Sequence, residues 1–266
     1  MGTDAAKDFD TIADDYAFFE RHATEAREDA NAYLSQIPEF TSAPGPIRML
    51  DFGCGSGAFT ARFLELVRWP PQQLQLSLVD PAAAVRRQAV ARLAPFTSAS
   101  IADWNELPAD LDGRFEVVLA NHVLYYVADL QALLSRLIHA AAPGGAIIAA
   151  IAPRANALIE FWIVGFKLLG RDVPYGTSED VERALRAIGA SCRKHPVPFE
   201  LTFPDTEENR MRIIRFLLAD HLAHIPLPPL MTLFDRYSNA GQIEIRTHSD
   251  HFTLVGSASA AQTVEN

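Results

Sequence analysis

The chain has 266 residues, of which 49% are hydrophobic and 21% are charged, and its net charge is −10. This composition is that of a globular protein and excludes collagen-like, coiled-coil and mostly disordered chains. The length suits one large domain with its own core. An acidic chain repels phosphate backbones, so we expect no nucleic-acid partner.

The cysteine content and the lengths of the apolar segments exclude further classes of protein. Two cysteines, Cys54 and Cys192, cannot make a disulfide framework or a four-thiolate metal site. Met1–Asp10 is acidic and lacks the basic flank and apolar stretch of a signal peptide. The most apolar segments, Ala146–Ala152 and Ala157–Leu169, are shorter than the roughly 20 residues that span a bilayer. We therefore expect a cytoplasmic protein with no membrane partner and no metal.

The N-terminal part of the chain has a helical pattern. Large apolar residues recur there at spacings of three or four, which predicts an amphipathic helix. They are Phe9, Ile12, Tyr16 and Phe19. A second helix is expected over 24–37, ending near Pro38, and Thr41–Pro46 is expected to be a linker.

From residue 47 onward, short apolar runs alternate with helical patterns. The expected strands are Ile47–Phe52, Leu74–Val79, Phe115–Ala120 and Ala146–Ile151, with a further strand ending near Asp103. The expected helices between them are 58–68, 82–93 and 129–142. Pro143-Gly144-Gly145 is expected to break the chain before the strand that begins at Ala146. This alternation predicts a mostly parallel sheet covered on both faces.

The segment after Ile151 has a looser order. Helices are expected over 155–169, 178–188, 207–221 and 230–237, and strands over 197–203 and 251–256.

A glycine-rich loop, Asp51-Phe52-Gly53-Cys54-Gly55-Ser56-Gly57, connects the first strand to the following helix. Glycines let the backbone turn sharply and approach a ligand closely, and the helix N-terminus offers free amide donors. Doubly wound sheets bind ligands at this position. The spacing Gly-x-Gly-x-Gly differs from the dinucleotide fingerprint, and the loop lacks the Gly-Lys-Ser or Gly-Lys-Thr of a phosphate-binding loop.

Two acidic residues follow at the ends of the next strands. Asp80 ends the second strand, where a carboxylate can accept both hydroxyls of a ribose. Asp103 precedes Trp104, and a carboxylate beside an aromatic ring suits an adenine. Each residue alone also fits a turn or a helix cap, but the three signals at successive strand ends together favour a ligand.

These segments resemble the class I S-adenosylmethionine-dependent methyltransferases. The resemblance implies an α/β, Rossmann-like, seven-stranded mostly parallel sheet with helices on both faces and helical cap insertions. It implies a single domain over 1–266. Within that domain, 1–40 would be an N-terminal helical lid, 47–154 the cofactor-binding core and 155–240 the substrate-cap helices, with C-terminal sheet strands at 197–203 and 251–256.

The same resemblance assigns a cofactor, S-adenosyl-L-methionine, with S-adenosyl-L-homocysteine as its product. Asp51 and the glycine loop would hold the methionine part, Asp80 the ribose, and Asp103 with Trp104 the adenine. The implied cofactor-binding residues are Tyr16, Asp51, Gly53, Cys54, Gly55, Gly57, Asp80, Pro81, Asp103, Trp104, Asn121 and His122. Cys54 is expected to be a packing residue without a nucleophilic role.

A further resemblance, to histamine N-methyltransferase-like enzymes, is carried by His22-Ala23-Thr24-Glu25 and by Val123-Leu124-Tyr125-Tyr126-Val127. It implies that Glu25 contacts a substrate amine. The substrate-binding candidates are His22, Glu25, Tyr126 and Trp162, and the catalytic candidates are His122, Tyr125 and Tyr126. His122 has two open roles, as a base and as a contact to the cofactor.

The leading hypothesis is methyl transfer to the nitrogen of a small-molecule amine. An O-methyltransferase acting on a carboxylate or hydroxyl is the alternative, with Arg154 and Arg171 as candidate anchors. A non-catalytic methyltransferase-like binding module is the third hypothesis. His221 and His224 have the spacing of metal ligands on a helix, but a structural role is favoured because no third ligand is evident. Both a monomer and a homodimer remain open.

Overall fold

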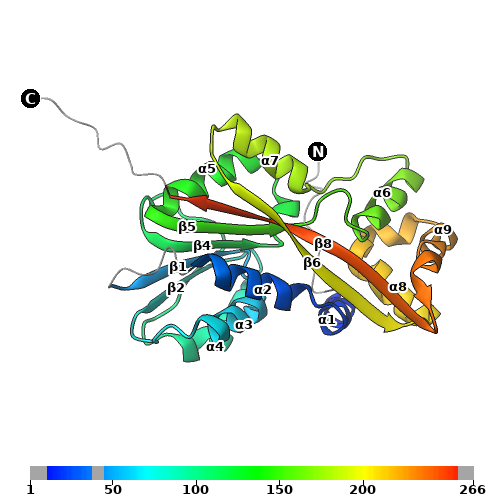
Figure 1. Cartoon of the computed structure of the whole chain (residues 1–266), viewed down its shortest axis with the longest axis horizontal. Helices are drawn as coiled ribbons and strands as arrows, with labels where there is room; N and C mark the ends of the chain where they lie inside the picture. The colour runs from blue at the N-terminus through cyan, green and yellow to red at the C-terminus, as the bar shows by residue number, and fades with distance from the viewer. Residues whose placement is uncertain (1–10, 38–44, 257–266) are drawn as a thin grey trace, which may run out of the picture.

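The computed structural model describes residues 11–37 and 45–256, and Figure 1 shows helices on both faces of one sheet. The main path through the sheet runs β3-β2-β1-β4-β5-β8-β6, and a short β7 pairs with β8. The strands are β1 (Ile47–Phe52), β2 (Leu74–Val79), β3 (Ala102–Trp104), β4 (Phe115–Asn121), β5 (Ala141–Ile151), β6 (Arg193–Pro204), β7 (Ser238–Asn239) and β8 (Gln242–Val255). Of the seven strands on the main path, β8 alone runs in the opposite direction to the other six. The predicted seven-stranded, mostly parallel sheet is therefore confirmed, with β7 as an addition.

The helices fall close to their expected positions. The α-helices are α1 (Ala13–His22), α2 (Glu25–Gln36), α3 (Ala58–Val67), α4 (Ala83–Leu93), α5 (Leu130–Ala140), α6 (Ile159–Leu168), α7 (Ser178–Ala187), α8 (Glu207–Leu218) and α9 (Leu227–Thr232). Short 3-10 turns complete them: η2 (Ala94–Phe96), η3 (Leu124–Tyr126), η4 (Ala219–His224) and η5 (Asp235–Tyr237). Within the described residues, no helix combines the length and apolar character needed to cross a membrane.

Side chains alternate along the strands and so build two cores. On β1, Met49 belongs to the core under α2, α3 and α4, together with Tyr33 and Phe63. The next residue, Leu50, belongs to the core on the other face, with Leu134 of α5. Both faces of the sheet are buried, as parallel strands require.

Strands β6 and β8 form a longer antiparallel pair than the sequence pattern predicts. Its pairing runs without a break from Arg193 opposite Thr253 to Pro204 opposite Gln242, whereas β5 pairs only with residues 250–255 of β8. The remaining half extends beyond the parallel strands toward α1 and α8 (Figure 1). The expected strand at 251–256 is thus the end of a strand that begins at residue 242. Its first half alternates exposed polar residues with buried isoleucines, which is the pattern of a strand with one buried face.

Strand β5 also differs from its prediction. It begins at Ala141, so Pro143, Gly144 and Gly145 lie inside the strand instead of before it. The pairing with β4 changes register between Phe115 and Val117. A register shift of this kind accommodates the proline and glycines that the sequence pattern treats as a break.

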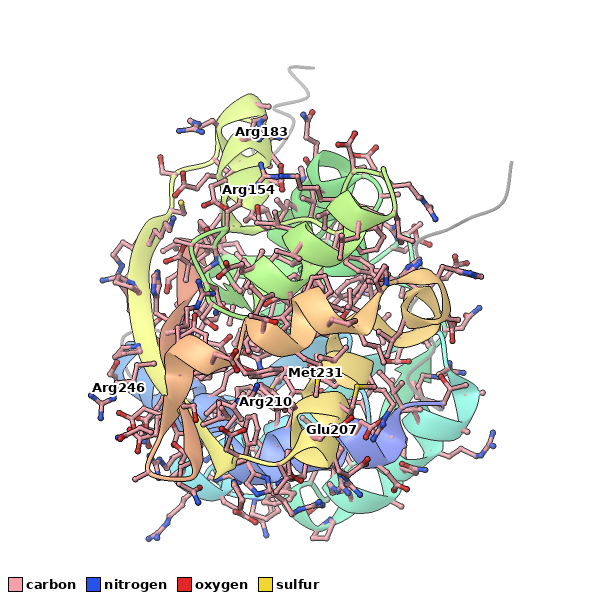
Figure 2. All side chains as sticks on the ribbon, turned by 90° about the vertical axis from the view of Figure 1, so that its right-hand side faces the viewer. Arg154, Arg183, Glu207, Arg210, Met231 and Arg246 are labelled. Carbon is pink, nitrogen blue, oxygen red and sulfur yellow. The ribbon has the colours of Figure 1, made fainter. Side chains whose placement is uncertain are left out.

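The cap helices α6, α8 and α9 lie at one end of the molecule, where Arg210 joins two of them. Figure 2 shows Arg210 of α8 close to Met231 of α9. Its guanidinium donates to the Met231 carbonyl at 3.0 Å and pairs with Asp205 and Asp235, each at 2.6 Å. This largely buried arginine, with its three acceptors, holds α8 to α9 and to the end of β6.

The N-terminal helices cover the edge of the sheet at which the parallel strands end. The first expected helix is found over 13–22, while Phe9 and linker residues 41–44 lie outside the described residues. The turn between α1 and α2 is fixed to β6, because the Thr24 amide donates to the Glu200 carbonyl at 2.8 Å. This anchor places α2 over the ends of β4 and β8.

Candidate functional site

The glycine loop lies at the carboxyl end of β1. Gly53, Gly55 and Gly57 have left-handed φ angles of +77°, +51° and +73°, which residues with a Cβ rarely adopt. The amides of Gly53 and Cys54 donate to the Val79 carbonyl at 2.7 and 3.1 Å. These bonds tie the loop to the end of β2.

Asp51 is a buried carboxylate at the base of this loop. It is 3% exposed and accepts a hydrogen bond from the Thr60 hydroxyl of α3. Burial, with a further contribution from Asp80, raises the pKa of Asp51 to about 6. A carboxylate in this state gains from a cationic partner such as an ammonium group.

Asp80 connects the ends of two strands to the loop. Its carboxylate accepts from the Gly55 amide at 3.2 Å and from the Ala82 amide at 2.9 Å. Asp103 on the neighbouring β3 is exposed and forms an ion pair with Arg86 at 3.5 Å. Asp51 of β1, Asp80 directly after β2 and Asp103 of β3 thus lie along one edge of the sheet.

The remaining cofactor candidates on this edge are placed as follows. Trp104 is half-buried beside Asp103, and Pro81 is exposed beside Asp80. Cys54 is buried, and burial raises the pKa of Cys54 well above its usual range, so its thiol stays protonated. This state agrees with the packing role expected for Cys54.

Strand β4 ends at Asn121, and His122 follows it. The Tyr33 hydroxyl of α2 donates to Oδ1 of Asn121 at 2.6 Å. His122 has a left-handed φ of +51°, and its amide donates to the Ala150 carbonyl at 2.9 Å. A non-glycine residue in this conformation is held there by its surroundings, as is common at functional sites.

His122 is enclosed by two carboxylates of α2 and a tyrosine of η3. Its Nε2 lies 2.9 Å from Oδ2 of Asp29 and 3.6 Å from Oε1 of Glu25. Its Nδ1 lies 3.0 Å from the Tyr125 hydroxyl oxygen, which also accepts from the Ala152 amide at 2.7 Å. We call Glu25, Asp29, His122, Tyr125 and His251 the acid–histidine cluster.

Charge determines protonation within this cluster. Burial lowers the pKa of His122, but Glu25 and Asp29 outweigh it and raise the value to about 9. Burial raises the pKa of Glu25 to about 7, against the opposing effect of His122. Burial also acts to raise the pKa of Asp29, but contacts with His122 and His251 hold it below its usual value.

Tyr16, a cofactor candidate, and Tyr126, a substrate candidate, are neighbours. Tyr16 is 37% exposed, and burial of its hydroxyl, with Glu20, Glu25 and Tyr126 nearby, raises the pKa of Tyr16. Tyr126 also has a raised pKa, caused by burial and then by Tyr175. Tyr16 therefore lies in the surroundings of Glu25.

Trp162 and His22 lie in packed positions. Trp162 is 4% exposed, and its indole donates to the Leu217 carbonyl at 2.8 Å. The Nδ1 atom of His22 lies 2.8 Å from the Phe18 carbonyl oxygen, and its ring centroid is 4.1 Å from that of Phe18.

Two residues of the cluster, Asp29 and His251, were not candidates from the sequence. His251 donates from Nε2 to Oδ1 of Asp29 at 2.7 Å, and Ser249 donates to Glu25 at 3.3 Å. Glu25 and Asp29 lie one turn apart on α2, and Ser249 and His251 lie on the same face of β8. The available signal was this matched polar spacing, four on a helix and two on a strand.

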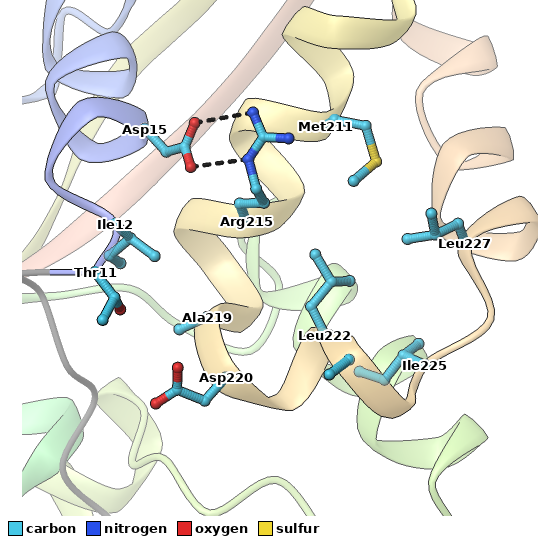
Figure 3. Close-up of a pocket in the computed structure, with 11 residues that line it drawn as sticks. Thr11, Ile12, Asp15, Met211, Arg215, Ala219, Asp220, Leu222, Ile225 and Leu227 are labelled. Carbon is cyan, nitrogen blue, oxygen red and sulfur yellow. Dashed lines mark hydrogen bonds and ion pairs between the residues drawn. The ribbon is translucent and has the colours of Figure 1, made fainter.

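A separate hollow lies between α1 and the cap (Figure 3). Its volume is about 480 Å³, and its charged pair, Asp15 with Arg215, is joined at 2.9 and 3.2 Å. Its lining residues are Thr11, Ile12, Asp15, Met211, Arg215, Ala219, Asp220, Leu222, Ala223, Ile225 and Leu227. None of these belongs to the glycine loop or the acid–histidine cluster, so the hollow is distinct from the site.

Known proteins show the same organisation. Residues 25–241 match a protein family described as "Methyltransferase domain". Trans-aconitate 2-methyltransferase of Acidovorax ebreus is 35% identical over 135 residues, covering 50% of this chain and 47% of that protein. Ubiquinone biosynthesis O-methyltransferase of Chelativorans sp. is 27% identical over 175 residues, covering 61% and 66%.

A solved structure has the same fold. Magnesium protoporphyrin IX methyltransferase of Synechocystis PCC 6803, crystallised with bound SAH, superposes with a TM-score of 0.51 at 14% identity, covering 87% of this chain and 84% of that one. The chain spans about half the length of the first curated relatives it matches. The family match covers most of the sequence and contains the glycine loop, the three aspartates and most of the acid–histidine cluster. The chain therefore belongs to the methyltransferase domain family.

Proposed function

We propose that this protein transfers a methyl group from S-adenosylmethionine to the nitrogen of a small-molecule amine. The residues at the strand ends fit this cofactor. The buried Asp51 carboxylate suits the cofactor's ammonium group, Asp80 suits its ribose hydroxyls, and Asp103 suits the amino group of its adenine. Among the described residues, a Cβ at Gly55 would meet nothing within 4 Å, so the loop backbone is open to a ligand on that side.

Glu25 is the observation that supports an amine as acceptor. Its carboxylate lies 3.6 Å from His122 at the end of β4, on the edge that carries the cofactor candidates. The charged groups that act on it are His122, Asp29 and Glu20, and none of these is a lysine or arginine. An ammonium group is attracted to such surroundings, whereas an anion is repelled.

The chain's own residues have two tasks in the reaction. Bound S-adenosylmethionine supplies an activated methyl group, which an uncharged amine attacks in line. Before that attack, a substrate ammonium must lose a proton. Glu25, whose pKa is about 7, binds the ammonium as a carboxylate and accepts this proton near neutral pH. Tyr16 lies near Glu25 and offers an aromatic face to a cation.

A carboxylate acceptor is less well supported, although one relative is named for trans-aconitate, a carboxylate anion. Such a substrate needs a cationic anchor near the reacting atom. The two arginines considered for that role, Arg154 and Arg171, are both exposed, and Figure 2 shows Arg154 on the outside of the molecule near α7. The main-chain amide of Arg154 donates to Glu179 at 3.1 Å.

A hydroxyl acceptor is the second candidate. The contact of 2.9 Å between Asp29 and His122 has the arrangement of a carboxylate-oriented general base, and one relative is an O-methyltransferase by name. This reaction requires His122 to be neutral and to have a nitrogen available to the substrate.

The test is methyl transfer from labelled S-adenosylmethionine to a panel of small amines, phenols and carboxylic acids, with the product identified by mass and charge. We expect a product that stays cationic. In Glu25→Gln, the KM for the amine should rise by about 10- to 100-fold, as expected for loss of a charged hydrogen bond, with S-adenosylhomocysteine affinity unchanged.

Glu28→Gln is the matched control, because Glu28 lies on the same helix but pairs with Arg27 at 2.7 Å. A neutral ester as the product, or an unchanged KM in Glu25→Gln, would contradict the amine assignment.

A further inference from the structure

Asp29 is a carboxylate whose surroundings require a positive charge. It is 1% exposed, and its two oxygens contact two imidazoles, Oδ2 with His122 at 2.9 Å and Oδ1 with His251 at 2.7 Å. A buried carboxylate is stable only when it is paired. One of these two histidines must therefore carry the compensating proton.

The hydrogen bonds of His251 exclude this residue as the carrier of the compensating proton. This residue is 0% exposed, and its Nδ1 has no hydrogen-bond partner among the residues that the structure describes. Its Nε2 donates to Asp29, so a neutral ring leaves only an unpaired acceptor at Nδ1. A second proton on this ring would bury an N–H donor with no acceptor next to a charge, which is the costlier state.

His122 can hold the proton without such a loss. Its Nε2 donates to Asp29, and its Nδ1 faces the Tyr125 oxygen at 3.0 Å. A phenol oxygen has two lone pairs, so Tyr125 can accept from the Ala152 amide and from a protonated Nδ1 together. Both N–H groups of a charged His122 then have acceptors.

We propose that Asp29, whose other oxygen accepts from a neutral His251, is a positioning residue that holds His122 as an imidazolium, so that Glu25 and not His122 takes the substrate's proton. The role of Glu25 as the acceptor of the substrate's proton rests on the proposed function. Glu25 and Asp29 of α2 and Tyr125 of η3 face His122, whereas His122, His251 and Tyr33 face Asp29. Two carboxylates and one imidazolium have a net charge of −1, which one substrate ammonium neutralises.

Nitrogen-15 spectra of histidine-labelled protein test this proposal, because they distinguish an imidazolium from each neutral tautomer. At pH 7 we expect His122 to carry protons on both nitrogens and His251 to carry one, on Nε2. In Asp29→Asn, which keeps an acceptor but removes the charge, the midpoint of the His122 titration should fall by about 1 to 3 pH units.

Two variants complete the design. In His251→Phe, which keeps a ring but removes the donor, His122 should still be an imidazolium at pH 7. His195→Gln is the matched control, since His195 lies on the neighbouring β6 and contacts Gln36 at 3.1 Å; it should leave the His122 signals unchanged.

A neutral His122 at pH 7, a doubly protonated His251, or an unchanged midpoint in Asp29→Asn would overturn the proposal. If Asp29→Asn does not fold, the wild-type spectrum alone decides. The spectra need no turnover, so a charged His122 in a protein that transfers no methyl group would contradict the proposed function and leave this assignment standing.

Discussion

A Cβ atom added at Gly53 would lie 2.3 Å from Cγ2 of Val123, so the glycine loop is in direct contact with the residue that follows His122. The substitution Gly53→Ala must displace Val123, and with it the end of β4. We expect the free energy of unfolding to fall by about 1–3 kcal/mol because of overpacking. We also expect affinity for S-adenosylhomocysteine to fall at least tenfold, measured by calorimetry.

Gly113→Ala is the control for backbone strain. Gly113 has a φ of +65°, close to that of Gly53, but an added Cβ would meet nothing within 4 Å in the described part of the chain. In Gly113→Ala the free energy of unfolding should fall only by the cost of the left-handed backbone conformation, about 1–2 kcal/mol. The affinity for S-adenosylhomocysteine should be unchanged. Equal losses of affinity in the two variants would show that contact with Val123 is not the cause.

Ionisation of Asp51 should make cofactor binding depend on pH. Its pKa is about 6, so the carboxylate becomes charged as pH rises through that value. Affinity for S-adenosylhomocysteine, whose ammonium group needs the charged form, should rise between pH 5 and 7. Calorimetry across this range should give a flat profile for Asp51→Asn; a rise of the same size in the variant would exclude Asp51 as its source.

Ionisation of Asp51 should affect the free energy of unfolding in the opposite sense. The pKa of Asp51 is higher in the folded protein, at about 6, than the roughly 3.9 of an unfolded chain. Between these values the folded state keeps the proton that the unfolded state has lost, so stability falls as pH rises. The contribution is on the order of 3 kcal/mol, and urea unfolding should show this fall reduced in Asp51→Asn.

Substrate binding should follow the ionisation of Glu25. Burial raises the pKa of Glu25 to about 7, so the carboxylate that binds an ammonium forms above that pH. The KM of a strongly basic amine, which stays charged throughout, should fall as pH rises from 6 to 8. In Glu25→Gln the KM should be high and independent of pH; a profile like that of the wild type would assign the titration to another group.

Local periodicity explains why so much of the fold could be predicted. The strand Ile47–Phe52 and the helix that begins at Ala58 follow from apolar spacing alone, and both appear within a residue or two of their predicted bounds. The first half of β8 was missed although Glu244 and Arg246 alternate with Ile243 and Ile245, a period of two that is the local signal of a strand with one buried face. Its pairing with β6 is a contact that no local window contains.

The site shows the same division between local and distant information. Asp51, Asp80 and Asp103 were predicted because each lies near the end of its own strand. Asp29 and His251 are 222 positions apart and meet only when α2 lies across β8. In the sequence, Asp29 is one of many acidic residues in an acidic segment, and only folding makes it a buried group that needs a partner.

Trp162 is the substrate candidate whose surroundings allow a sharp test. It is 4% exposed, and its indole donates to the Leu217 carbonyl at 2.8 Å, while its ring meets Tyr125 edge-on with centroids 5.5 Å apart. Trp162→Phe removes the donor and leaves a buried carbonyl unpaired. We expect the free energy of unfolding to fall by about 1–3 kcal/mol, with no change in the KM for the amine.

The matched control for this substitution is Trp69→Phe in the other core, where the indole packs edge-on against Phe63 with centroids 5.8 Å apart. Trp69 is only half-buried, so its stability loss should be the smaller of the two. A KM that rises fivefold or more in Trp162→Phe, at unchanged stability, would instead place this ring against the substrate. Because Tyr125 lies between Trp162 and His122, that result would also extend the substrate pocket behind the acid–histidine cluster.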